Sequence, residues 1–337
     1  MKAWQKHHFG LENLKLVDIP IPKPGPKQLL IRVKSVSLNY RDKAIVDGVY
    51  WPDLMNKPFV PVSDAAGVVV EAGPEVVRFK EGDRVISHLF TRWTDGAPGE
   101  NENPYAIGGP NNGGLAEYML LDEDAAVAAP SSLTDDEAST LPIAGLTAWF
   151  SLVEYGKLVP GETVLVQGTG GVSIFGVQIA SALGARVIAT TSSDEKGERV
   201  RALGASEIIN YVTRPDWEKA VLELTNGKGV QHILEVAGGE SVNRSIEALA
   251  PQGHINIIGF LDNMTAKVNL LSLLFKQAQL QGILVGHRKA LEAMCKAFDE
   301  LVIKPVIDTV YSFNDAIQAY KHLNRGAFGK IVIRVAD

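Results

Sequence analysis

The middle of the chain carries a glycine-rich turn between an apolar run and an amphipathic run. The apolar run is Glu162–Gln167, the turn is Gly168-Thr-Gly-Gly171, and the amphipathic run is Val172–Leu183. A second apolar run, residues 185–190, follows directly. A strand, a glycine turn, a helix and a second strand within about 30 residues are typical of a parallel, doubly wound sheet that binds a dinucleotide. We therefore expect a dinucleotide site here; the alternative is a tight turn that binds nothing.

The residue types in this turn suit the approach of a pyrophosphate. Gly168 permits the tight turn, and Gly170 leaves the backbone open to the phosphates. The following helix offers its free N–H groups and the positive end of its dipole. Ser173 stands where a third glycine is usual; its small side chain still allows close packing of helix on strand, with Gly176 helping one turn later. The candidate contacts in the turn are Gly168, Thr169, Gly170, Gly171 and Val172.

The segment after the second strand, Thr190-Thr-Ser-Ser-Asp-Glu-Lys196, indicates which dinucleotide binds. An acidic residue at the end of that strand would hold the ribose 2′-hydroxyl of NAD and repel a 2′-phosphate. Here hydroxyl side chains come first, so the segment predicts that NADP(H) is preferred over NAD(H). Asp194 either folds back to the ribose or caps the next helix, and we favour the cap. The candidate donors to the 2′-phosphate are Thr191, Ser192, Ser193 and Lys196.

The remaining pattern predicts an α/β chain. After residue 130, short apolar runs alternate with helical runs, which indicates a parallel sheet with both faces covered. Before residue 125, short β-type runs such as Gln28–Val36 and Ala66–Ala72 are separated by Gly and Pro. Arg92–Gly114 is rich in Gly, Asn and Pro and reads as a long surface lobe. We expect a doubly wound parallel sheet plus a second, β-rich domain.

Composition excludes several classes of function. The 337 residues carry a formal net charge of −6, so no basic field attracts nucleic acid or an anionic membrane surface. The single cysteine, Cys295, can form neither an internal disulfide nor a cysteine-based zinc cluster, and we expect it to be a buried thiol. Residues 1–8 lack the apolar run of a signal peptide, and no window approaches 18 apolar residues. We expect a cytoplasmic protein.

Several further motifs keep a common order along nearly the whole chain. They are Ser37-Leu-Asn-Tyr-Arg-Asp42, Asp64-Ala-Ala-Gly-Val-Val69, Gly82-Asp-Arg-Val85, Gly113-Gly-Leu-Ala-Glu-Tyr118, Ala144-Gly-Leu-Thr-Ala-Trp149 and Gly329-Lys-Ile-Val-Ile333. With the glycine turn, they resemble the medium-chain dehydrogenase/reductase superfamily, particularly its quinone oxidoreductase-like branch. The resemblance implies a discontinuous GroES-like catalytic domain (1–125 with 288–337) around a Rossmann domain (126–287). It also implies a homodimer formed through an edge strand near Gln281–Gly286.

The same resemblance locates the metal positions of zinc-dependent members. In this sequence those three positions read Asn39, Ser63 and Ile143. An isoleucine cannot ligate a metal, and amide and hydroxyl oxygens are poor zinc ligands. The lobe that holds a structural zinc in such members spans about residues 92–112 here and contains no cysteine. The seven histidines show no metal spacing. We expect no zinc.

Hydride transfer without a metal needs polar side chains that stabilise negative charge developing on the substrate. The resemblance places the turn Asn39-Tyr-Arg-Asp42 beside the nicotinamide, so Tyr40 and Arg41 are candidate donors to a substrate oxygen, with Asn39 as an orienting amide. Asn39 and Asp42 also read as a capping pair for a helix over residues 41–46. Both roles stay open for Asn39, and a structural role is favoured for Asp42. Tyr50 and Trp51 either line a substrate pocket or pack.

The resemblance assigns further contacts with the cofactor. Thr147 would face the nicotinamide end, or pack on the helix from Ala144 to Val153. Lys330 would reach the cofactor or close the domain cleft, although a solvated lysine after a glycine is commoner. The remaining positions are Val236 with Gly238 and Gly239 for the adenosine half, Gly259 and Phe260 for the ribose, and Val285 and Gly286 for the carboxamide.

These expectations combine into a functional hypothesis. The lead is an NADPH-dependent reductase of quinones, enones or related carbonyl compounds. One alternative is a zinc-free dehydrogenase of alcohols or aldehydes, and the other is an NADPH-binding protein with little turnover. The expected partners are a small carbonyl or quinone substrate and a second copy of the chain, with no nucleic acid and no membrane.

Overall fold

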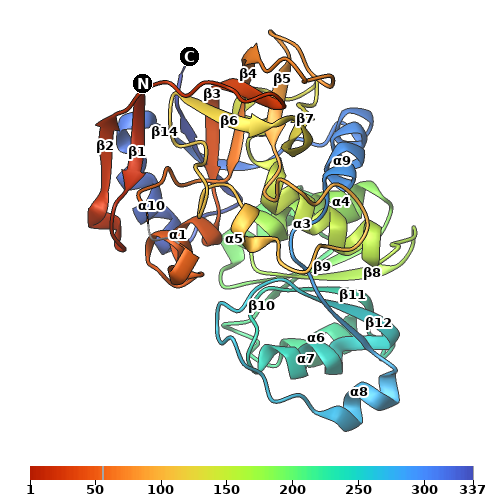
Figure 1. Cartoon of the computed structure of the whole chain (residues 1–337). Coiled ribbons are helices and arrows are strands. Elements are labelled where there is room, and N and C mark those ends of the chain that lie inside the picture. Colours follow the sequence, from red (N-terminus) through yellow and green to blue (C-terminus); the bar gives the residue numbers. More distant parts are fainter. Residues whose placement is uncertain (55–56, 337) are drawn as a thin grey trace. The chain divides into compact units, whose positions relative to one another are not determined.

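The computed structural model describes residues 1–54 and 57–336. It divides into two units, one formed by Met1–Leu146 with His287–Asp337 and the other by Thr147–Gly286. In Figure 1 the first unit is coloured red to yellow and dark blue, and the second green to cyan. No helix among the described residues is long and apolar enough to cross a membrane.

Unit 1 is built on an antiparallel-rich sheet that a returning C-terminal segment completes. The sheet order is β14-β15-β3-β4-β5-β7, and β6 pairs with the amino-terminal half of β3. A separate hairpin joins β1 (Lys2–Lys6) to β2 (Leu14–Asp18). The sheet strands are β3 (Gln28–Leu38), β4 (Asp64–Ala72), β5 (Arg84–Ser87), β6 (Tyr118–Asp122), β7 (Ala126–Ala128), β14 (Ile307–Ser312) and β15 (Lys330–Arg334).

Helices cover this sheet and carry the residues that matter below. α1 (Tyr40–Val46) follows β3 directly, and α10 (Ala316–Arg325) packs on β15 and β14. α9 (Arg288–Leu301) is amphipathic, and its Cys295 is buried, as expected for a core thiol. Burial raises the pKa of Cys295 well above its ordinary value, so the thiol stays protonated.

The first domain boundary expected from the sequence is wrong. Residues 126–146 were expected in the Rossmann domain, but they belong to unit 1. β7 pairs antiparallel with β5 of the unit 1 sheet, with Ala126 opposite Ser87 and Ala128 opposite Val85. The short helix α2 (Asp135–Ala138) then packs against β3. A three-residue strand gives no sequence signal of its own, since its partner lies forty residues earlier in the chain.

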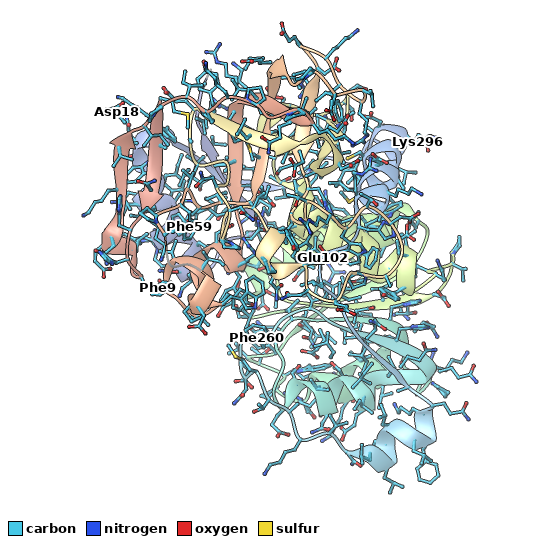
Figure 2. The ribbon with its side chains drawn as sticks, in the orientation of Figure 1. Phe9, Asp18, Phe59, Glu102, Phe260 and Lys296 are labelled. Carbon is cyan, nitrogen blue, oxygen red and sulfur yellow. The ribbon has the colours of Figure 1, made fainter. Side chains whose placement is uncertain are left out.

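The Arg92–Gly114 lobe is part surface and part core. Residues 95–101 are mostly exposed, whereas Ala106, Ile107 and the following glycines are buried. Glu102, labelled in Figure 2, accepts a hydrogen bond from the backbone of Gly99 at 2.9 Å. The backbone oxygens of Trp93 and Thr94 accept from the first N–H groups of α9, so the start of the lobe is fixed to that helix.

Unit 2 is a six-stranded parallel sheet of order β10-β9-β8-β11-β12-β13. Numbered within the unit, this is the 3-2-1-4-5-6 order of the doubly wound dinucleotide-binding fold. The expected fold class is therefore confirmed. The strands are β8 (Thr163–Gln167), β9 (Arg186–Thr191), β10 (Glu207–Asn210), β11 (Val230–Glu235), β12 (Leu249–Ile257) and β13 (Gln279–Gly282).

Helices lie on both faces of this sheet. Figure 1 shows α4 (Gly171–Ala182) on one face and α6 (Trp217–Leu224) with α7 (Ser241–Ala248) on the other. α5 (Asp194–Ala202) packs on β9 and β10, and α8 (Leu270–Lys276) leads into β13. The chain order reverses between β8 and β11, and ligands of such sheets bind at the carboxyl ends of the strands there.

Candidate functional site

The glycine turn lies at the reversal point of the unit 2 sheet. β8 ends at Gln167, Gly168 has a φ of +74°, and Gly170 is the residue that precedes α4. A Cβ atom built on Gly168 or Gly170 would meet no heavy atom within 4 Å, so space is open beside this backbone. The first N–H groups of α4 have no acceptor within the helix. An open cradle at the N-terminus of a twelve-residue helix fits a pyrophosphate.

The packing of α4 behind the turn is as tight as the sequence predicted. A Cβ on Gly176 would lie 2.4 Å from Cδ1 of Leu234 on β11. Ser173, at the position of the third glycine, is buried and donates its hydroxyl to the backbone oxygen of Gln167 at 2.7 Å. Gly168 and Gly170 thus face open space, whereas Gly176 serves helix–strand contact. The two kinds of glycine have different functions.

A buried polar network that the sequence analysis missed supports this turn. The Glu235 side chain, at the end of β11, is fully buried. Its carboxylate accepts from the Gln167 side chain at 2.7 Å, from the hydroxyls of Ser241 and Ser245, and from the backbone of Ala237 and Gly238. The network joins the carboxyl ends of β8 and β11 and the start of α7. A polar residue ending each of two otherwise apolar strands was the available signal.

Several expected cofactor contacts come together at this edge of the sheet. Val236 donates its N–H to Gln167, and a Cβ on Gly259 would lie 2.6 Å from the Val236 oxygen. Phe260, labelled in Figure 2, follows Gly259, and the isolated bridge from Gly238 to Asn263 closes the same loop pair. Val285 and Gly286 follow β13 and are buried. Thr147 is also buried, and its backbone oxygen accepts from Ser151.

The loop after β9 differs from expectation in two respects. The residue that caps α5 is Ser193, whose hydroxyl accepts from the Lys196 N–H; Asp194 is the first helical residue, so its assignment as the cap was wrong. Thr191 is buried, and its hydroxyl lies 3.4 Å from both the N–H and the oxygen of Ser193. Ser192 is exposed, and Ser193 and Lys196 are partly exposed.

The neighbouring strand β10 adds residues that the sequence analysis did not single out. Asn210, at its end, donates from its side chain to the Asp194 carboxylate at 2.8 Å. Tyr211 donates its backbone N–H to the Thr191 oxygen, which places it beside the end of β9. Parallel strands end at one edge, so the residue after β10 necessarily adjoins the loop after β9.

Unit 1 holds the other candidate residues in a buried polar cluster at the start of α1. The Asn39 backbone N–H donates to the Asp42 carboxylate at 2.8 Å, so Asp42 caps the helix as expected. The Asn39 side chain instead joins two other groups. Its Nδ2 donates to Asp64 at 2.8 Å, and its Oδ1 accepts from the Lys330 ammonium at 2.6 Å.

Lys330 is not a solvated lysine, which corrects the commoner outcome considered for it. Its side chain is 3% exposed and also donates to the backbone oxygen of Leu38 at 2.8 Å, with Asp64 Oδ2 at 3.8 Å. Burial lowers the pKa of Lys330 and raises the pKa of Asp64 to about 6, although each group opposes the shift of the other. Its contact partners lie within unit 1, and its assignment as a cofactor contact stays a prediction.

Tyr40 and Arg41 differ in their exposure to solvent. Tyr40 is exposed, whereas the Arg41 guanidinium is buried and donates to the backbone oxygen of Gly109 at 2.6 Å. Burial lowers the pKa of Arg41, and Asp42, 4.0 Å away, opposes this. Nε and Nη1 of Arg41 have no hydrogen-bond partner among the described residues. Trp51 lies with its ring centre 5.9 Å from the guanidinium carbon.

The positions that hold zinc in metal-dependent members do not suit zinc here. The side-chain oxygen of Asn39 already accepts a hydrogen bond from the Lys330 ammonium. Ser63 is fully buried, and Ile143 is apolar. Across residues 1–54 and 57–336, no group of three histidine, cysteine, aspartate or glutamate side chains is arranged to hold a metal ion. Amide and hydroxyl oxygens are poor zinc ligands, and the Asn39 oxygen already accepts from Lys330.

Comparisons with known proteins cover both units. An alcohol dehydrogenase GroES-like domain model matches residues 25–131, and a model described as zinc-binding dehydrogenase matches residues 171–300. A zinc-type alcohol dehydrogenase-like protein of Schizosaccharomyces pombe is 38% identical over an alignment of 335 residues that covers 97% of this chain and 96% of the relative. The chain belongs to the medium-chain dehydrogenase/reductase superfamily.

Other relatives locate it within that superfamily. A chloroplastic quinone oxidoreductase of Triphysaria versicolor is 31% identical, covering 99% of this chain and 98% of its own. A crystal structure from Sinorhizobium meliloti 1021, provisionally named an alcohol dehydrogenase, superposes with a TM-score of 0.92 at 47% identity, covering 99% and 98% of the two chains. A Pseudomonas syringae quinone oxidoreductase gives 0.83 at 29% identity, covering 99% of each chain. This member of the superfamily is an oxidoreductase, for which a nicotinamide nucleotide is the expected cofactor.

Proposed function

We propose that this superfamily member reduces a quinone, enone or related carbonyl compound with NADPH and without catalytic zinc. The observation that carries the proposal is the open glycine cradle at Gly168 and Gly170, followed by a loop whose exposed donors are hydroxyls and a lysine. A bound nicotinamide supplies the hydride. The residues of the chain bind the nucleotide, orient the substrate and stabilise the charge that develops on its oxygen.

The preference for NADPH is supported by the environment of Asp194. This is the acidic side chain nearest the end of β9 that could hold a ribose diol. Its carboxylate is hydrogen-bonded to Asn210, and it begins a helix rather than ending the strand. Ser192, Ser193 and Lys196 are left to donate toward a phosphate. Three donors, beside an Asp194 carboxylate that is bound to Asn210, favour the 2′-phosphate over the 2′-hydroxyl.

Arg41 is the proposed donor to the substrate oxygen. Its buried guanidinium has N–H groups at Nε and Nη1 that pair with no described residue, and arginine side chains stay protonated in proteins. A fixed cation in a site shielded from water stabilises developing negative charge far more than it would in solution. Asn39 has committed its amide to Lys330 and Asp64, so we assign it an orienting function. Tyr40, which is exposed, is the second candidate donor.

Zinc independence is part of the proposal and is supported by the ammonium bound to Asn39. Prolonged chelation followed by metal analysis tests it. Unchanged activity is expected, and activity that is lost on chelation and restored by zinc would contradict it. We also propose the cytoplasm as the compartment, because one buried cysteine places no demand on an oxidising environment; cell fractionation tests this.

A zinc-free alcohol or aldehyde dehydrogenase is the second candidate, favoured by the relatives named alcohol dehydrogenase. NADPH oxidation with a panel of quinones and enones, set against a panel of aldehydes, separates the two. Turnover confined to quinones or enones supports the lead, and turnover confined to aldehydes supports the second candidate. NADPH binding without turnover of any compound would instead identify a nucleotide-binding protein.

A further inference from the structure

Lys330 is brought to Asn39 by the order of three neighbouring strands. β15 pairs with β3, where Ile331 lies opposite Leu38, and β3 pairs with β4, where Ser37 lies opposite Asp64. Lys330, the end of β3 and Asp64 therefore meet at one corner of the sheet. The juxtaposition depends on residues separated by nearly three hundred positions in the chain.

Asn39 has all of its side-chain and backbone polar groups committed in this corner. Its N–H binds Asp42, its Nδ2 binds Asp64, its Oδ1 binds Lys330, and its backbone oxygen accepts from the Asp42 N–H at 3.0 Å. An amide with opposite partners on its two ends has one orientation and cannot flip. Tyr40 and Arg41 follow directly on α1, so the position of Asn39 sets where that helix begins.

The corner is electrically balanced by its own side chains. Two carboxylates, Asp42 and Asp64, are fully buried, and two cations, Arg41 and Lys330, are buried with them. Desolvating so many charges is unfavourable, and apolar side chains of the same volume would often stabilise a fold better. A buried ammonium here is therefore better explained by orientation of its neighbours than by stability.

We propose that Lys330 is a positioning residue whose ammonium fixes Asn39, at a position that the resemblance assigns to a zinc ligand in metal-dependent members. It neutralises the adjacent carboxylate and fixes the donors at the start of α1. The inference goes beyond the absence of zinc, since it names the group that binds the Asn39 oxygen and the function of that contact. The expected effect of Lys330 on catalysis rests on the proposed reductase function.

Three variants test whether the charge or only the volume of Lys330 matters. Lys330→Met keeps the length and removes the ammonium, Lys330→Arg keeps a cation, and Lys296→Met is the control on the exposed surface of α9 (Figure 2). We expect Lys330→Met to lower Tm by roughly 10 °C, because an uncompensated carboxylate stays buried. We expect kcat to fall about 100-fold from misplacement of the donors, with the Kd for NADPH unchanged. Lys330→Arg should recover most of both.

A fourth variant supplies a readout that packing alone would not move. Lys330→Ala removes the atoms that n-propylammonium can replace. Addition of n-propylammonium chloride should raise the Tm of Lys330→Ala more than tetramethylammonium chloride at equal ionic strength, since the latter has no N–H donor. This measurement uses neither cofactor nor substrate. A rise in Tm together with a carbonyl panel that shows no turnover would sustain the positioning assignment and end the proposed function.

The inference is overturned by any of three results. The first is a Lys330→Met variant with the Tm and kcat of Lys330→Arg. The second is equal Tm values for Lys330→Ala in the two amine salts. The third is a Kd for NADPH that weakens in Lys330→Met while kcat is unchanged, which would make Lys330 a cofactor contact instead.

Discussion

At the residue scale, the two classes of glycine show how one residue type serves two purposes in a single turn. Gly168 and Gly170 border open space, and Gly176 borders Leu234. The sequence pattern named all three correctly, because the requirement for glycine or a small residue at each position is local. It did not find Gln167 and Glu235, whose hydrogen bonds depend on β8 and β11 being neighbours.

We expect the choice of cofactor to depend on single residues as well. Ser192 is exposed in the loop after β9, and an acidic side chain there would repel a 2′-phosphate. We predict that Ser192→Asp raises the Kd for NADPH by about 10-fold or more and leaves the Kd for NADH within about 3-fold. Fluorescence titration measures both constants.

Ser206→Asp is the matched control, because it adds the same charge at the amino end of β10, away from the loop. Its affinities should equal those of the unchanged protein. Equal NADPH affinity in Ser192→Asp and Ser206→Asp would show that the loop after β9 does not bind the 2′-phosphate.

We expect a buried histidine to make the stability of unit 2 depend on pH. His232 is 1% exposed, lies 3.0 Å from Glu162 and stacks on His254. Burial lowers the pKa of His232, with the Glu162 contact opposing and His254 adding to the shift. Because the folded pKa lies below the unfolded one, this contribution to stability is complete above the ordinary histidine pKa and is lost as pH falls from there through the folded pKa.

We therefore predict that the unchanged protein loses Tm between pH 7 and pH 5 more steeply than His232→Gln, which keeps a donor to Glu162. Thermal scans across that range measure the difference. His8→Gln, at an exposed position, is the control and should follow the unchanged protein. Parallel Tm profiles for His232→Gln and the unchanged protein would rule out this histidine as the source.

At the element scale, α8 and β13 present an unusual surface. Among the described residues, β13 pairs only with β12, which leaves its other edge without a strand partner there. α8, which precedes it, exposes four large apolar side chains, with Phe275 74% exposed. Apolar groups gathered beside a free strand edge mark an interaction surface. We propose a second copy of the chain as the occupant. The exposed side chains are Leu270, Leu271, Leu274 and Phe275.

The oligomeric state tests this surface. We predict that Leu271→Glu with Phe275→Glu converts a dimer into a monomer in size-exclusion chromatography with light scattering. Val77→Glu is the control, because Val77 is an isolated apolar residue of unit 1 that is 87% exposed. A monomeric unchanged protein, or a dimer that survives both substitutions in α8, would refute the proposed interface.

At the scale of the whole molecule, the sequence was sufficient for the fold class and for the glycine turn but not for the buried corner of unit 1. The parallel sheet was predictable because short apolar runs, which form the centres of most of its strands, alternate with helices. The boundary after residue 125 was not, since it depends on the three-residue strand β7 pairing with β5. The burial of Lys330 was equally hidden, because β15 reaches β3 only through the returning C-terminal segment.

The same distinction separates the two parts of the candidate site. The geometry of one βα turn follows from adjacent residues, so the open backbone at Gly168 and Gly170 could be expected from the sequence, and nucleotide binding there stays a prediction. Contacts of Asn39 and Arg41 follow from four separate segments: α1, β4, β15 and the glycines of the lobe. Local sequence patterns predicted the start of α1 and its cap. Only the structure showed which of these side chains are hydrogen-bonded within unit 1.

The central claim is that a dinucleotide phosphate occupies the space beside Gly170, and one matched pair of variants tests it most directly. Gly170→Ala puts a methyl group into open space at a φ of −77°, so Tm should not change. Gly176→Ala puts the same group 2.4 Å from Leu234, so Tm should fall. We predict that Gly170→Ala weakens the Kd for NADPH by about 10-fold or more at unchanged Tm. NADPH that binds Gly170→Ala as tightly as the unchanged protein would contradict the account.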